Sequence, residues 1–178
     1  MKKTLFSIIF LTILLVGLSA MSFQAGLTYT QPASLDNIIG GMKEKNLSVL
    51  LAGHEVCVSG HMTDSFLDVG IDAGVALHES ASWVPVPLFR AYVGMKVRLF
   101  EYFGIGGHVG GQIKLLSDNS FDASLFWRFA GEIMIEPINI ELYMALPVPL
   151  DQGLASVFNF GTAAHNARFG LAVTYEFI

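Results

Sequence analysis

The chain has 178 residues, of which 53% are hydrophobic and only 14% are charged, a composition that excludes a disordered chain. The formal net charge of −5 argues against a basic nucleic-acid binder, so we expect no nucleic-acid partner. The single cysteine, Cys57, excludes an intramolecular disulfide framework and a cysteine-rich zinc site.

The chain begins with the layout of a secretory signal peptide. Positions 2 and 3 are lysines, an apolar run follows over 5–18, and small residues come next. We predict cleavage after Ser22, with cleavage after Ala20 and an uncleaved membrane anchor as alternatives. No cysteine follows the small residues, so we expect no lipid anchor. Residues 1–22 are therefore assigned to the signal peptide and 23–178 to an exported domain.

The exported domain alternates between apolar and polar residues with period two, which predicts β-strands. In 67–77, for example, the odd positions are apolar and the even positions are aspartate, glycine or alanine. The alternation predicts eight strands, at about 23–30, 47–58, 66–78, 88–100, 102–116, 121–136, 138–147 and 167–178. The phase of the second strand is broken at 50–52, as at a bulge. Most of the strands have about the 9–11 residues that a tilted strand needs to cross a bilayer.

The connections predict an up-and-down meander with two different ends. Those near 101 and 137 are very short, as periplasmic turns are in outer-membrane barrels. If the N-terminus is periplasmic, the outer connections are 31–46, 79–87, 117–120 and 148–166. Two connections do not fit well, because the outer one at 117–120 is short and the inner one at 59–65 is not minimal.

Two features favour a polar interior and a lipid-facing apolar exterior over a soluble lipocalin-like barrel, whose faces are the other way round. The polar face is rich in glycine, which weakens a solvent-facing strand but makes room for long side chains in a narrow barrel. The charges on this face also balance, and an enclosed interior requires such pairing because an unpaired buried charge costs several kcal/mol. The cations are Arg90, Lys96, Arg98, Lys114, Arg128 and Arg168, and the anions are Asp68, Asp72, Glu132, Glu136, Glu141 and Glu176.

The loop after the third predicted strand sets the register between the third and fourth strands. In that register the residue numbers of two facing positions add up to about 166–168. This register pairs Asp68 with Arg98 and Asp72 with Lys96. Opposite charges placed across two strands attract each other.

The turn near Pro137 makes facing positions sum to about 273–275, which sets Glu132 opposite Glu141. The two carboxylates could share a proton for acid–base chemistry or complete an ionic network, and we favour the network. The predicted interior network consists of Asp68, Asp72, Arg90, Lys96, Arg98, Arg128, Glu132 and Glu141.

The last predicted strand carries a known pattern. The segment Arg168-Phe169-Gly170-Leu171-Ala172-Val173-Thr174-Tyr175 has a polar residue, then glycine two positions later, then apolar or aromatic residues at alternate positions. This segment resembles the terminal strand that the assembly machinery reads in outer-membrane barrels, although Ile178 stands last where phenylalanine is frequent. With the signal peptide, the chain is similar to the small barrels of the outer-membrane protein A and X group.

That resemblance implies an all-β fold, namely an eight-stranded antiparallel up-and-down transmembrane β-barrel in the cell outer membrane. It also implies outer-membrane lipid and the barrel-assembly machinery as partners. The implied assembly signal consists of Gly170, Val173, Tyr175 and Phe177.

Candidates for catalysis are weak. The five histidines lack metal-ligand spacing, so we expect no metal and no cofactor. A lipid hydrolase or acyltransferase would need Ser80, Ser82 or Ser156 beside His78 or His165, and nothing in the sequence fixes that geometry. We therefore expect no enzyme, but a structural or interaction protein with a largely closed interior. The alternatives are a narrow pore or transporter for small or apolar solutes and a soluble periplasmic lipocalin-like binding protein.

Overall fold

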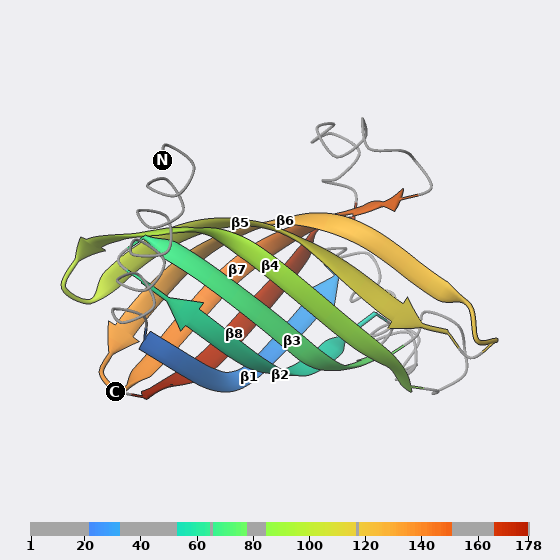
Figure 1. Ribbon diagram of the computed structural model, residues 1–178, viewed down its shortest axis with the longest axis horizontal. Coiled ribbons are helices and arrows are strands. Elements are labelled where there is room, and N and C mark those ends of the chain that lie inside the picture. The colour runs from blue at the N-terminus through green and yellow to red at the C-terminus, as the bar shows by residue number, and fades with distance from the viewer. Residues whose placement is uncertain are drawn as a thin grey trace, which may run out of the picture.

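The computed structural model describes residues 22–32, 53–64, 66–77, 85–116, 118–150 and 166–177. In these residues eight strands form a closed barrel, in which each strand pairs with the next and the last pairs with the first (Figure 1). The strands are β1 (Ser22–Pro32), β2 (Glu55–Thr63), β3 (Leu67–Leu77), β4 (Pro85–Phe100), β5 (Phe103–Leu115), β6 (Phe121–Ile135), β7 (Ile138–Pro149) and β8 (Arg168–Phe177). All neighbouring pairs are antiparallel, so the predicted all-β, eight-stranded up-and-down fold is confirmed. Among the described residues, no helix is long and apolar enough to span a membrane.

The bounds predicted for the second strand, 47–58, are wrong. The strand β2 spans Glu55–Thr63, and only three residues separate it from β3. The apolar run at 50–52 draws the sequence pattern toward the N-terminus, whereas the cleaner alternation begins at Glu55. The inner connection predicted at 59–65 is therefore a turn of three residues, one more than in each of the other two inner turns. The predicted bulge at 50–52 falls on residues that the structure does not describe.

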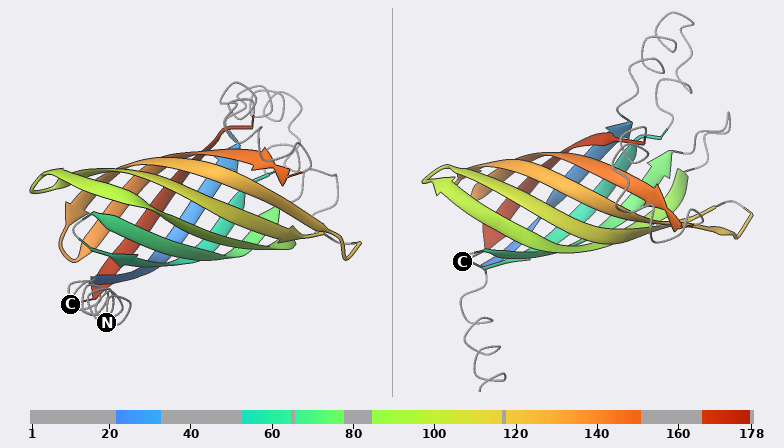
Figure 2. Two further views of the ribbon diagram at one scale, coloured as in Figure 1. Left: turned by 45° about the horizontal axis from the view of Figure 1, so that its top comes forward. Right: turned by 90° about the horizontal axis from the view of Figure 1, so that it is seen from above.

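The strands are staggered around the barrel. A path that moves from each residue to its ladder partner on the next strand starts at Ser22 and returns to β1 at Pro32, a displacement of 32 − 22 = 10 residues. The path runs through Thr63, Asp68, Gly94, His108, Arg128, Ala145 and Arg168. This stagger tilts the strands, as Figure 2 shows, and an eight-stranded barrel has an interior just wide enough for side chains.

The register between β3 and β4 differs from the prediction. Leu77 pairs with Pro85, so facing positions sum to 77 + 85 = 162 rather than to 166–168. The predicted pairing of Asp68 with Arg98 and of Asp72 with Lys96 is therefore wrong. The reason is that β4 begins at Pro85, three residues before the predicted start. Between β6 and β7, in contrast, Glu132 faces Glu141 and the predicted sum of 273 is confirmed.

The barrel has two distinct ends. The first residues of β1 pair with the last residues of β8, so both lie at one end together with the short turns after β2, β4 and β6. We call this the termini end. The last residues of β1, β3, β5 and β7 lie at the opposite end, which we call the loop end (Figure 2).

The faces of the sheet are inverted relative to a soluble barrel. Side chains that point outward are large and apolar, such as Leu27 at 61% exposure and Ile71 at 63%. Among the described residues, buried polar and charged side chains outnumber buried apolar ones. The polar core of the barrel therefore contains the candidate functional site.

Candidate functional site in the barrel interior

Of the charged residues predicted inside, Lys96 is half-buried and Arg98 is exposed at the termini end. The other six are buried: Asp68, Asp72, Arg90, Arg128, Glu132 and Glu141. They form three clusters along the barrel, in part with partners that the sequence does not suggest.

The lowest cluster, toward the termini end, is an ion pair between Lys96 and Glu132. Glu132 stands opposite Glu141 in the ladder, but the two carboxylates turn to different cations, because Glu141 binds Arg128. Each carboxylate thus has its own counter-charge, an arrangement that supports the ionic network over a shared proton.

The middle cluster encloses Arg128, whose side chain is 2% exposed. Its Nε donates a hydrogen bond to Glu141 Oε1 at 2.9 Å, and its Nη2 donates to the same oxygen. The guanidinium carbon lies 3.8 Å from the ring centre of Tyr143 and 4.7 Å from that of Tyr92. Asp72 Oδ2 lies 3.9 Å from Nη1. Charge-assisted hydrogen bonds and two aromatic faces together replace the water that the cation has lost.

The two tyrosine rings that flank Arg128 depend on glycines. Tyr92 faces Gly70 across β3 and β4, and Tyr143 faces Gly170 across β7 and β8. A Cβ atom on either glycine would overlap the partner ring. Glycine on the inner face therefore makes room for tyrosine rings that lie flat across the neighbouring strand, and these rings hold the arginine.

Asp68 lies between two histidines just below the arginine. His108 Nε2 donates a hydrogen bond to Asp68 Oδ2 at 2.8 Å, and His61 Nδ1 lies 3.7 Å from Oδ1. His61 Nε2 is also 3.0 Å from the hydroxyl of Tyr92. These contacts join the histidines to the arginine cluster through a shared tyrosine.

The upper cluster is organised around Glu55, which is 1% exposed. Its carboxylate binds Arg90, and it lies 3.0 Å from Lys114 Nζ and 3.0 Å from Arg168 Nη1. Arg90 Nη1 is also 3.7 Å from Asp72 Oδ2, which connects this cluster to the middle one.

Glu55 is the main residue that the sequence analysis missed. The signal is present, because Glu55 shares its phase with the buried Cys57, Ser59, His61 and Thr63. The predicted strand at 47–58 hid this phase. Glu136, which was assigned to the charged face, instead lies exposed in the turn after β6.

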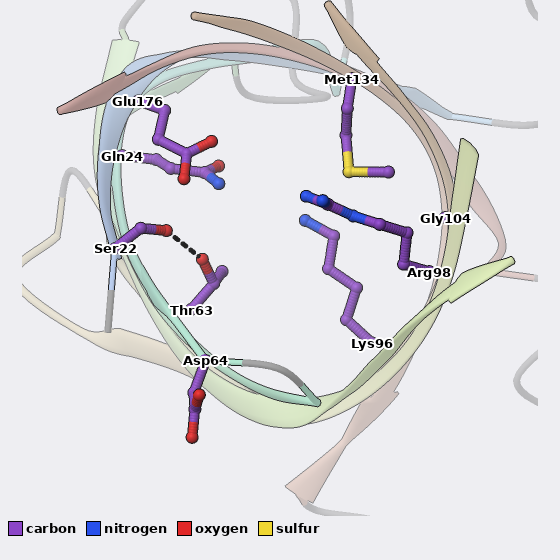
Figure 3. A pocket seen from close by; sticks show the side chains of 9 residues that line it. All are labelled: Ser22, Gln24, Thr63, Asp64, Lys96, Arg98, Gly104, Met134 and Glu176. Atoms are coloured by element: carbon purple, nitrogen blue, oxygen red, sulfur yellow. Dashed lines mark hydrogen bonds between the residues drawn. The ribbon is translucent and has the colours of Figure 1, made fainter. Parts of the chain in front are cut away.

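Two cavities flank the charged clusters. The one at the termini end has a volume of about 400 Å³ and is drawn in Figure 3. The one at the loop end has a volume of about 210 Å³ and is lined in part by Lys114, Asp122 and Arg168. Lys96 of the lowest cluster lines the first cavity, Lys114 and Arg168 of the upper cluster line the second, and the middle cluster lies between them.

The residues of the predicted assembly signal divide between the two faces. Val173, Tyr175 and Phe177 are exposed on the outer surface. Gly170 faces inward against Tyr143.

Cys57 is buried inside the barrel with Ala76, Val86 and Leu88. The serine and histidine candidates for catalysis, Ser80, Ser82, Ser156, His78 and His165, lie outside the described residues.

No protein-family model matches the chain, and no curated protein matches its sequence. The assignment of function therefore rests on the geometry of the barrel.

Substitution of Gly70 by alanine is expected to destabilise the barrel by about 1–3 kcal/mol, because the new methyl group overfills the space that the Tyr92 ring occupies. Gly107→Ala is the control, since nothing lies within 4 Å of a Cβ at that position. Equilibrium urea unfolding of the refolded barrels measures the difference. Equal free energies of unfolding for the two variants would contradict the proposed packing role of Gly70.

Substitution of Glu55 by glutamine is expected to lower the free energy of unfolding by about 3–5 kcal/mol, because three cations lose their common counter-charge. The same change at the exposed Glu136 should stay within about 0.5 kcal/mol of the unsubstituted protein. Equilibrium urea unfolding of the refolded barrels tests both statements. If the Glu55→Gln barrel were as stable as the Glu136→Gln barrel, Glu55 would not be a stabilising counter-charge for the three cations.

Proposed function

We propose that this chain is an integral outer-membrane β-barrel protein with a structural or interaction role and a charge-paired, largely closed interior. The observation that carries the proposal is the inversion of the two faces of a closed barrel. Charged side chains such as Arg128 and Glu55 are enclosed, whereas apolar side chains such as Leu27, Ile71 and Leu142 point outward.

The apolar exterior is too extensive for a water-soluble monomer. Exposed large apolar side chains occur on every one of the eight strands. Soluble monomers rarely expose a contiguous apolar patch of more than a few hundred Å². In lipid this surface needs no cover, and a closed barrel satisfies its own backbone hydrogen bonds without a free strand edge.

The dimensions of the strands also agree with a membrane barrel. The shortest, β2, has 9 residues and the longest, β4, has 16, whereas a tilted strand needs about 9–11 to cross the hydrocarbon layer. Aromatic side chains stand on the outer surface near the strand ends, among them Phe23, Tyr175 and Phe177 at the termini end. Aromatic girdles of this kind are typical of outer-membrane barrels at the level of the headgroups.

A soluble lipocalin-like binder is the weaker interpretation. Such a barrel keeps its apolar side chains inside, around an apolar ligand. Here the described interior holds Arg90, Arg128, Asp68 and Asp72 among other buried polar groups.

The proposal includes the location and the partners. The signal peptide expected at 1–22 would export the chain, and outer-membrane lipid would contact the barrel exterior. The barrel-assembly machinery would read β8, whose Val173, Tyr175 and Phe177 stand exposed on the lipid-facing side.

A narrow pore is the second candidate function, and the cavity of about 400 Å³ at the termini end is the observation that favours it. A continuous pore would also require a path past Arg128, which contacts Tyr92, Tyr143 and Glu141 at the centre of the barrel.

Arginine in place of Ile71, midway along β3, is expected to destabilise the barrel in lipid by about 2–4 kcal/mol, because the charge would face the bilayer centre. Arginine in place of Phe100, at the end of β4 and 74% exposed, should cost at most about 1 kcal/mol. Equilibrium unfolding in lipid vesicles measures the free energy of unfolding of both variants. Carbonate extraction of native membranes and heat-modifiable gel mobility provide the independent check. Release by carbonate, together with equal tolerance of both arginines, would exclude membrane insertion.

In planar bilayers the purified barrel is expected to show no discrete conductance steps at neutral pH, because the paired side chains around Arg128 fill the centre. An empty bilayer with the same detergent is the control. Discrete single-channel steps would overturn the closed interior and favour the pore, without affecting the membrane assignment.

A further inference from the structure

The cavity at the termini end has two walls of opposite charge. Lys96 and Arg98 of β4 point into it side by side, as Figure 3 shows. Glu176 of β8 and Gln24 of β1 point in from the facing wall. Asp64 also lines the cavity, but its carboxylate is directed away from the centre (Figure 3).

Two of these charges are not neutralised by the barrel. Lys96 is paired with Glu132, but neither Arg98 nor Glu176 forms an ion pair with any residue that the structure describes. Glu176 accepts only a long hydrogen bond, of 3.4 Å, from Asn139. The two side chains face each other across the cavity without forming an ion pair, which distinguishes them from every charged cluster deeper in the barrel.

The net charge of each wall follows from these pairs. On the β4 side, Lys96, Arg98 and Glu132 together carry one positive charge. On the opposite side, Glu176 contributes one negative charge. A molecule that neutralises both walls must carry one negative and one positive group, so the cavity is complementary to a zwitterion.

A further donor lies beside the cations. Gln24 is 7% exposed, and its side-chain oxygen accepts a hydrogen bond of 3.1 Å from Thr174. Its amide nitrogen has no partner among the described residues, and Gln24 lines the cavity. Because this N–H is open to the cavity, it can donate to an oxyanion bound there, and hydrogen bonds to a charged acceptor are the stronger kind.

We propose that this cavity binds a small zwitterion with one oxyanion group and one ammonium group. Arg98 binds the oxyanion, supported by Lys96 and the Gln24 amide, and Glu176 binds the ammonium. Arginine suits this role because its planar fork matches the oxygens of a phosphate or a carboxylate. A volume of about 400 Å³ lies in the range of small-molecule sites. A phosphodiester with an amine, as in a lipid headgroup, and a free amino acid share this chemistry.

The site rests on the geometry of the barrel and not on its proposed location, so its failure would leave the membrane assignment intact. The experiment is calorimetric titration of a folded barrel in a non-ionic detergent at constant ionic strength. The chain begins at Met21, the alternative cleavage position, so that Ser22 still lines the cavity and no new ammonium group lies beside Glu176. The probes are glycerophosphoethanolamine and glycine, which carry both charges, and glycerophosphoglycerol, which lacks the ammonium. Tighter binding of glycerophosphoethanolamine would indicate a lipid headgroup, and tighter binding of glycine would indicate an amino acid.

Arg98→Gln is expected to weaken binding of every probe by about tenfold or more, since a charge-assisted pair is lost. Glu176→Gln is expected to weaken only the two zwitterions and to leave glycerophosphoglycerol unchanged or bound more tightly. Lys114→Gln, which removes a cation that lines the cavity at the loop end, is the charge-matched control and should change none of the affinities. Heat-modifiable mobility confirms that each variant is folded.

The proposal is overturned if no probe binds saturably to the folded protein. It is overturned equally if Arg98→Gln binds as tightly as the unsubstituted barrel, or if Lys114→Gln loses as much affinity as Arg98→Gln. If Glu176→Gln weakens glycerophosphoglycerol as much as glycerophosphoethanolamine, Glu176 does not recognise an ammonium group and the zwitterion assignment is wrong.

Discussion

One buried cation, the guanidinium of Arg128, governs the arrangement of the interior. Removing such a charge from water costs several kcal/mol unless it is paired and hydrogen-bonded. The barrel meets this requirement with Glu141 and with the faces of Tyr92 and Tyr143. The tyrosines can lie flat only because glycine faces each of them on the adjacent strand. Aromatic and glycine positions on four strands thus follow from one charge.

Closure of the barrel extends this requirement along its axis. Every strand contributes alternate side chains to an interior of fixed width, so a charge at one level is compensated by residues at its own level or the next. Asp72 shows the connection, since it lies 3.7 Å from Arg90 and 3.9 Å from Arg128. The middle and upper clusters are therefore parts of one ionic column, and a change in one cluster alters the electrostatic environment of the other.

The length of each turn decided whether the pairing of interior residues could be predicted from the sequence. The turn at Pro137 is minimal and leaves no freedom in register, so the pairing of Glu132 with Glu141 follows from counting. The connection between β3 and β4 is long, and a one-residue change in a strand start alters every pair across it. Asp68 and Asp72 were for that reason placed inside correctly but given the wrong partners. The sequence analysis missed Glu55 because a neighbouring apolar run shifted the predicted strand. The contacts between glycine and tyrosine depend on the register of neighbouring strands, which the composition of a strand does not determine.

Two arginines of the same barrel show how enclosure separates structural charges from charges available to a ligand. Arg128 lies where water cannot reach, so the protein itself must supply an anion, and it does so with Glu141. Arg98 stands at the edge of an open cavity, where water can solvate its charge and no internal anion is required. An internal partner at Arg98 would fill the cavity and remove the exposed donors. Pairing at the centre and unpaired charge at the mouth are therefore compatible with one narrow barrel, because dielectric screening decreases from the mouth to the centre.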